Sequence, residues 1–221
     1  MTRHMLLVFA LAAALILIAT AANQCFADDR GLQLNEDQLK IEQAVLHVVT
    51  QGIPEHKIEP FVGNEIARDK TKRVDLILAI DEASKKWAVP PMLLVAMAYR
   101  EGSFTMEGGG ALGEQSTWQM MGYVAKHIKE TIEPECTLET YRGSALCAAA
   151  WLAHNRDKCG SLDGSFVMYA TGNRCEPRTG HVVWLVRDRF GLARRLEEIT
   201  SHSETPDSLT LSSNSESSGN P

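Results

Sequence analysis

The sequence has no excess of basic residues and few signals of β-strands. Its 22 Lys and Arg against 28 Asp and Glu give a formal net charge of −6, so we predict no nucleic-acid partner. The seven histidines form no metal-like grouping, and there is neither a Gly-x-Ser-x-Gly motif nor a phosphate-binding loop. We therefore predict no metal and no cofactor. No internal repeat is present, and the scarcity of strand signals beside stretches of helical periodicity predicts a mainly α fold.

The first 27 residues have the pattern of a secretory signal peptide. A basic residue precedes an apolar run over 5–19, and small residues lead to a cleavage site after Ala27. A retained anchor is disfavoured because the run is shorter than the roughly 20 residues that usually span a bilayer. A lipid on Cys25 is disfavoured because polar residues precede it directly. We expect a periplasmic or secreted protein.

Four cysteines remain after this cleavage: Cys136, Cys147, Cys159 and Cys175. An even number in an exported chain predicts two disulfides. Zinc binding is the competing interpretation, but these cysteines lack the close spacing of a zinc knuckle. Three connectivities are open, and we favour sequential pairing, Cys136 with Cys147 and Cys159 with Cys175.

The rest of the chain has the length of one globular domain, and we expect a monomer. Basic clusters at 68–73 and 187–195 are interpreted as a solvated connector and the polar face of a helix. Residues 28–73 are predicted to form an N-terminal helical extension, and the Ser-rich segment 200–221 a disordered tail. Loop structure is predicted for the glycine-rich segment 102–113. Helices are predicted over 35–50, 74–88, 91–101, 116–129, 143–154, 163–170 and 181–199, the last interrupted at Gly191.

Glu101 is the candidate catalytic residue. It follows an apolar run over 92–99 and precedes Gly102. Desolvation raises the pKa of a carboxyl group, and an acid still protonated near neutral pH can give a proton to a leaving oxygen. The alternative is a solvated residue at the end of a core helix.

Three short motifs follow one another along the chain. The first is Arg-Glu-Gly-Ser-Phe at 100–104; the second runs from Gly-Ala-Leu-Gly at 110–113 to Trp-Gln-Met at 118–120; the third is Phe-Val-Met-Tyr-Ala-Thr-Gly-Asn at 166–173. Their order resembles the lysozyme-like (SLT) catalytic domain of lytic transglycosylases in the goose-type lysozyme superfamily. The resemblance covers roughly 74–172, and it implies a disulfide-containing, lysozyme-like helical domain over 74–199.

The resemblance assigns roles to individual residues. Glu101 matches the family's catalytic acid, but Gly102 replaces the usual serine, so a hydroxyl there would have to come from Ser103. Gln119 matches a substrate-contacting amide, with Gln115 as a second register. Tyr169 matches a tyrosine near the acid. Each of the last two could instead be structural.

Two further departures concern the second half of the site. Ala170 and Thr171 stand where relatives have Asn-Ala, and Asn173 is the only nearby asparagine that could substitute. Trp118 could stack on a sugar, although tryptophan is more often a core residue.

The implied reaction is cleavage of peptidoglycan glycan strands by a single carboxylic acid. In the family, the acid protonates the oxygen between N-acetylmuramic acid and N-acetylglucosamine, and then draws the muramyl C6 hydroxyl onto C1 to form a 1,6-anhydro sugar. Glu107 and Glu114 could instead assist a water, which would make the protein a hydrolytic muramidase. A non-catalytic glycan-binding relative in a cell-envelope assembly and an unrelated helical interaction protein are the remaining alternatives.

Overall fold

The computed structural model describes residues 32–61, 63–107, 110 and 112–202. The predicted signal peptide and the tail beyond residue 202 lie outside the described part. The chain is mainly helical, as predicted. Its elements are α2 (Glu36–Thr50), η1 (Pro54–His56), α3 (Glu65–Arg68), α4 (Lys70–Trp87), α5 (Pro91–Gly102), β1 (Glu114–Gln115), β2 (Met120–Met121), α6 (Gly122–Thr131), α7 (Tyr141–Cys159), α8 (Leu162–Thr171) and α9 (Gly180–His202).

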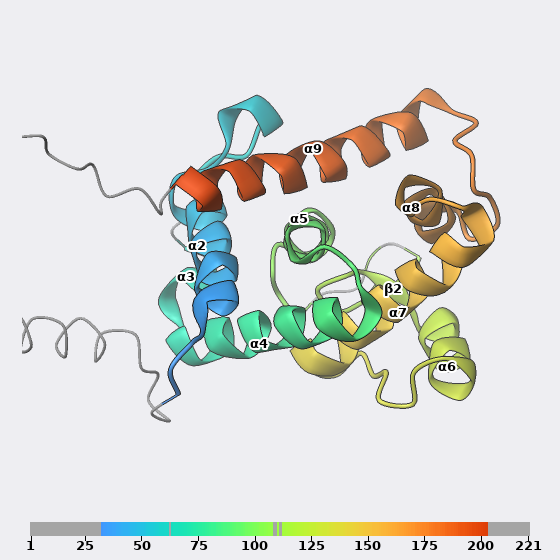
Figure 1. The fold of residues 1–221 in the computed structure, drawn as a ribbon, viewed down its shortest axis with the longest axis horizontal. Helices are drawn as coiled ribbons and strands as arrows, with labels where there is room; N and C mark the ends of the chain where they lie inside the picture. The colour runs from blue at the N-terminus through green and yellow to red at the C-terminus, as the bar shows by residue number, and fades with distance from the viewer. Residues whose placement is uncertain (1–31, 62, 108–109, 111, 203–221) are drawn as a thin grey trace, which may run out of the picture.

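Helix α5 is the central element of the fold. Pro91 occupies its first turn, where a missing N–H costs little, and every residue from 92 to 98 is buried. Figure 1 shows α5 end-on in the middle of the molecule, with α9 above it, α4 below it and α2 to one side. These helices cover the apolar positions of α5. Glu101 lies in the last turn of α5, where it is partly exposed.

The N-terminal region belongs to the same helical body as the rest of the described chain. The side chain of Asn35 caps α2 by accepting a hydrogen bond from the backbone N–H of Gln38. The side chain of Gln38 in turn accepts a hydrogen bond from the backbone N–H of Asn35. Helix α2 packs against α4, α5 and α9. The predicted connector at 68–73 is largely helical, because Asp69 caps α4 and the helix begins at Lys70.

The segment 116–121 is not helical, which corrects the prediction for 116–129. Strands β1 and β2 pair antiparallel, and the turn between them places Ser116 and Gln119 in the left-handed region, with φ of 67° and 47°. Trp118 explains this turn, because its side chain is fully buried and its Nε1 donates to the carbonyl oxygen of Leu94 at 3.1 Å. Helix α6 begins only at Gly122.

Helix α9 is continuous, so the predicted interruption at Gly191 is absent. A Cβ atom at Gly191 would lie 3.1 Å from Cε1 of His56. The glycine therefore lets α9 approach η1 without breaking the helix. Helix α9 also runs to His202, three residues beyond the predicted end.

Both disulfides pair sequentially, as favoured from the sequence. Cys136 bonds to Cys147 and Cys159 to Cys175, with Cα–Cα distances of 4.8 and 5.2 Å. The second bridge joins the segments on either side of α8. Within the described residues, no helix has the length and apolar character needed to cross a membrane.

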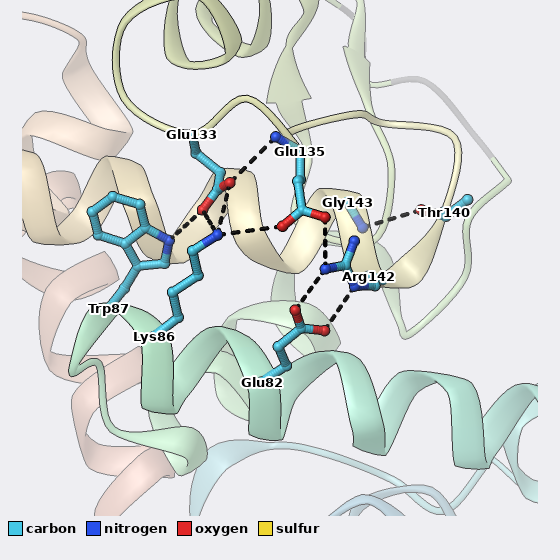
Figure 2. Close-up of polar contacts among 8 residues, drawn as sticks. All are labelled: Glu82, Lys86, Trp87, Glu133, Glu135, Thr140, Arg142 and Gly143. Atoms are coloured by element: carbon cyan, nitrogen blue, oxygen red, sulfur yellow. Dashed lines mark hydrogen bonds and ion pairs between the residues drawn. The ribbon is translucent and has the colours of Figure 1, made fainter.

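A polar cluster ties the loop between α6 and α7 to α4 (Figure 2). The fully buried Glu133 accepts hydrogen bonds from Trp87 Nε1 and Lys86 Nζ, each at 3.0 Å. Arg142 contacts both Glu82 and Glu135. The buried carboxylate of Glu133 thus has a charged donor, Lys86, and a neutral donor, Trp87, as hydrogen-bond partners. This cluster anchors the loop that carries Cys136 of the first disulfide.

Candidate active site

Three of the residues matched by the motifs line one cavity. Glu101, Gln119 and Tyr169 all face a space of about 630 Å³. They come from the last turn of α5, the β1–β2 turn and α8. Residues separated by up to 68 positions in the sequence thus meet at one site, which is the arrangement that a catalytic acid with substrate-contacting partners needs.

The carboxylate of Glu101 is held by Arg189. Oε1 accepts from Arg189 Nε at 3.1 Å and from Nη2 at 2.8 Å. The Glu101 side chain is 24% exposed, whereas that of Arg189 is 7% exposed. Glu101 is therefore not the isolated acid in apolar surroundings that the run before it predicts. Its partner is a buried guanidinium, although the sequence placed Arg189 on a polar helix face.

Further charges lie behind this ion pair. Asp188 Oδ2 accepts from Arg189 Nη1 at 2.9 Å, and Asp188 Oδ1 accepts from Arg100 Nη2 at 2.6 Å. Nδ1 of His56 lies 3.7 Å from the same Oδ1 atom. Opposite charges thus alternate from Glu101 to Arg100 and connect α9 to the end of α5.

Tyr169 lies at the wall of the cavity, and its hydroxyl is neutral. Burial, and then the negative charge of Glu101, raise the pKa of Tyr169 well above its usual value. Its hydroxyl donates to the carbonyl oxygen of Trp118 at 2.5 Å. Tyr169 therefore fastens α8 to the β1–β2 turn, while Trp118 itself is a core residue.

Gln119 is oriented by its own turn. Its Nε2 donates to the carbonyl oxygen of Ser116 at 2.8 Å, and its Oε1 would lie 3.1 Å from a Cβ atom at Gly110. Gln115, the second register, is exposed on β1 and does not line the cavity among the described residues. Of the two registers, Gln119 is therefore the one that faces the cavity.

Ser103 is not brought to the cavity. It is exposed and caps α5 in the left-handed conformation, with φ of 50°, and its carbonyl oxygen accepts from Asn64 Nδ2 at 2.9 Å. Asn173 is likewise exposed and absent from the described lining, whereas Ala170 and Thr171 belong to it. Ser103 therefore does not supply the hydroxyl that Gly102 lacks, and Asn173 does not supply the asparagine that Ala170 replaces.

The structure separates the two acidic residues that could assist a water, Glu107 and Glu114. Glu114 lines the cavity with Glu101, and its Oε2 accepts from the backbone N–H of Leu112 at 3.0 Å. Glu107 lines a different cavity of about 470 Å³, beside Tyr141. Of these two, Glu114 is therefore the one placed to act as a second carboxylate.

Sequence reasoning missed several other residues at or near the cavity. His127 and Trp151 line it, and the exposed Tyr123 stands at its rim. Trp184 is 54% exposed, with the Arg189 guanidinium 6.0 Å from its ring centroid. Their positions depend on helix packing, and no local motif marks them.

The described residues contain no group of three or more His, Cys, Asp or Glu side chains able to hold a metal ion. Comparisons with protein-family models, with curated proteins and with solved structures give no match for this chain. What the cavity does is therefore inferred from its own residues.

Proposed function

We propose that the protein is a peptidoglycan lytic transglycosylase with a lysozyme-like helical domain. The observation that carries this proposal is the meeting of Glu101, Gln119 and Tyr169 at one cavity. Each of the three resembles a family residue through a separate motif of the sequence, and the motifs themselves say nothing of how the three lie in space. An exported location is part of the proposal, since the substrate lies outside the cytoplasmic membrane, and the two disulfides suit an oxidising compartment.

The proposed reaction uses Glu101 twice. In its protonated form it gives its proton to the glycosidic oxygen between N-acetylmuramic acid and N-acetylglucosamine as the bond from C1 to that oxygen breaks. The acetamide oxygen of the muramyl residue stabilises the positive charge that develops at C1. The Glu101 carboxylate then takes the proton of the C6 hydroxyl while O6 bonds to C1. Glu101 ends protonated, and no water is consumed.

The other residues position the substrate in this proposal. The side-chain amide of Gln119 is held at Nε2 by its turn, which suits an amide that contacts the polar groups of a sugar. The hydroxyl of Tyr169 is raised in pKa and stays neutral near pH 7, so it does not compete with Glu101 for a proton. Exposed Tyr123 at the rim offers an aromatic face for a sugar ring.

A hydrolytic muramidase is the second candidate. It is favoured by Glu114, which lines the same cavity and could activate a water. The two enzymes differ in their products, because hydrolysis leaves a reducing muramyl end and the transglycosylase leaves a 1,6-anhydro end.

Digestion of purified sacculi tests whether the protein cleaves glycan at all. The chain, produced in an oxidising compartment, is expected to release soluble muropeptides. Glu101→Gln is expected to lower the rate by roughly 100- to 10,000-fold, because the amide keeps the shape but delivers no proton. Glu107→Gln is the matched control, since Glu107 lines the other cavity, and it is expected to digest at the wild-type rate.

Three results would contradict the proposal in different ways. A folded Glu101→Gln protein with unimpaired turnover would remove this residue from the mechanism. A wild-type protein that binds sacculi without releasing fragments would be a glycan-binding module. A protein that neither binds nor cleaves sacculi would have another function altogether.

A further inference from the structure

The contact between Arg189 and Glu101 has the geometry of a positioning interaction. Two N–H groups of one guanidinium, Nε and Nη2, converge on the single oxygen Oε1 at 3.1 and 2.8 Å. Among the described residues, the hydrogen bonds of this carboxylate all fall on Oε1. Glu101 itself lines the cavity, and its second oxygen, Oε2, makes no hydrogen bond to a described residue.

Arg189 is itself held in place from behind. Its third nitrogen, Nη1, donates to Asp188 at 2.9 Å, and Asp188 is 7% exposed and bound by Arg100 on its other oxygen. Arg100 also donates to the carbonyl oxygen of His56 at 2.6 Å. A guanidinium fixed on two sides is pre-organised, so it restricts the rotamer of Glu101 at little further entropic cost.

The same contact distinguishes the two oxygens of Glu101. Oε1 already accepts from two N–H groups of Arg189. In the proposed reaction the proton is therefore given and taken by Oε2.

Other charged or titratable groups lie around this pair. Tyr169 faces Glu101 from α8 and Glu114 shares the cavity from β1. Asp188 and His56 lie behind Arg189, on α9 and η1. Arg189 is the cation in direct contact with Glu101.

We propose that Arg189 is a positioning residue for Glu101, which holds the carboxylate by one oxygen and presents the other to the substrate. This inference rests on the proposed function, because it concerns the acid of that reaction. It adds a residue from α9 that the three motifs do not contain.

The split between kcat and KM tests this inference, with solubilised glycan strands as substrate. Arg189 contacts Glu101 and does not line the cavity among the described residues. Arg189→Gln is therefore expected to lower kcat by roughly 10- to 100-fold, because the carboxylate is no longer oriented. KM is expected to stay within about threefold of the wild-type value.

Arg189→Lys separates charge from geometry. Lysine keeps the positive charge but lacks the planar fork, so kcat is expected to fall in Arg189→Lys as well, by less than in Arg189→Gln. Arg187→Gln, on the exposed side of the same helix, is the matched control and is expected to change neither kcat nor KM. An Arg189→Gln protein with the wild-type kcat would overturn the inference.

A second measurement is independent of catalysis. The Glu101 side-chain carboxyl can be followed by NMR in protein labelled with ¹³C-glutamate and assigned with Glu101→Gln. At one fixed pH, its resonance is expected to move in Arg189→Gln and to keep its position in Arg187→Gln, because only the first variant loses the contact with the guanidinium. If the wild type digests no sacculi yet the resonance moves, the proposed function fails while the contact of Arg189 with Glu101 stands.

Loss of a buried charge partner can also unfold a protein, since it leaves the other charge uncompensated. Arg189→Lys is therefore also the reserve variant, because it keeps a cation beside Glu101 and Asp188. If Arg189→Gln does not fold, a folded Arg189→Lys protein with the wild-type kcat would overturn the inference.

Discussion

Gly102 lies directly against the backbone of Thr117. A Cβ atom at Gly102 would come within 2.5 Å of the Thr117 carbonyl oxygen and 2.9 Å of its Cα. The helix that carries Glu101 therefore packs directly against the turn that carries Gln119, because Gly102 has no side chain. This contact gives a packing reason for glycine at the position where the resembled family has serine.

Gly102→Ala is expected to destabilise the protein by about 1 to 3 kcal/mol, the usual cost of overpacking. Displacement of the Thr117 backbone should also weaken sacculus digestion. Gly180→Ala is the control, since a Cβ atom there meets nothing within 4 Å. Urea unfolding of the three proteins measures the difference. Equal stability of Gly102→Ala and the wild type would show that the two segments separate easily.

The disulfide between Cys159 and Cys175 closes a loop that contains α8 and hence Tyr169. Substitution of both cysteines by serine is expected to lower the free energy of unfolding by about 3 kcal/mol, mainly through the unfolded chain. Thermal unfolding with and without reductant checks this. Four free thiols, found by mass spectrometry in protein from an oxidising compartment, would contradict the predicted bridges.

Parts of this fold could be predicted because the signals are local. Asn35 before a periodic segment marks the start of α2, and Pro90 and Pro91 mark the start of α5. The four cysteines predicted two bridges from their number alone. The place of Glu101 in the fold is local in the same way, since the apolar run before it predicts the helix whose last turn it occupies.

The remaining features depend on distant partners. Ser116 and Gln119 take up left-handed conformations because the turn must bury Trp118, and helical periodicity over 116–129 gives no sign of it. Arg189 lies in a basic stretch, yet its side chain is buried and pairs with Glu101, 88 positions earlier in the chain. Glu107 and Glu114 look alike in sequence, and only the path of the loop separates them.

The pKa of Tyr169, raised first by burial and then by Glu101, predicts a stability change in alkali. Above about pH 10 the unfolded chain releases this proton and the folded chain keeps it. The stability that this proton contributes is thus complete below pH 10 and is lost as pH rises further, at up to about 1.4 kcal/mol per pH unit.

Urea unfolding at pH 8, 10 and 10.5 measures this loss, and Tyr169→Phe is expected to reduce its slope. Burial also raises the pKa of Tyr141, whose hydroxyl donates to the carbonyl oxygen of Phe104, so Tyr141→Phe should act in the same direction. A slope unchanged in both variants would show that other groups govern the alkaline loss.

Truncation after His202 is expected to leave the melting temperature and digestion unchanged, because the Ser-rich composition beyond it offers little apolar surface to bury. Truncation after Arg195 is the contrast. It removes the buried Leu196 and Thr200 from α9, and it is expected to cost several kcal/mol. A large loss from the shorter truncation would show that the tail docks onto the domain.

The products of digestion decide between the transglycosylase and the hydrolase. Anhydromuramyl ends are expected, about one water or roughly 18 Da lighter than hydrolysis products, and they take up no hydrogen from borohydride. Mass spectrometry of muropeptides, with and without borohydride reduction, distinguishes the two. The expectation rests on Glu101 acting as acid and then as base, so that no separate base for water is needed.

Glu114 is the residue that could reverse this result, because it lines the cavity with Glu101. If Glu101 acts alone, Glu114→Gln is expected to change the rate by less than about tenfold, and the products should stay non-reducible. Glu107→Gln, from the separate cavity, sets the scale for a neutral change. Reducible products from the wild type, with activity lost in Glu114→Gln and kept in Glu107→Gln, would show that Glu114 activates a water and that the enzyme is a muramidase.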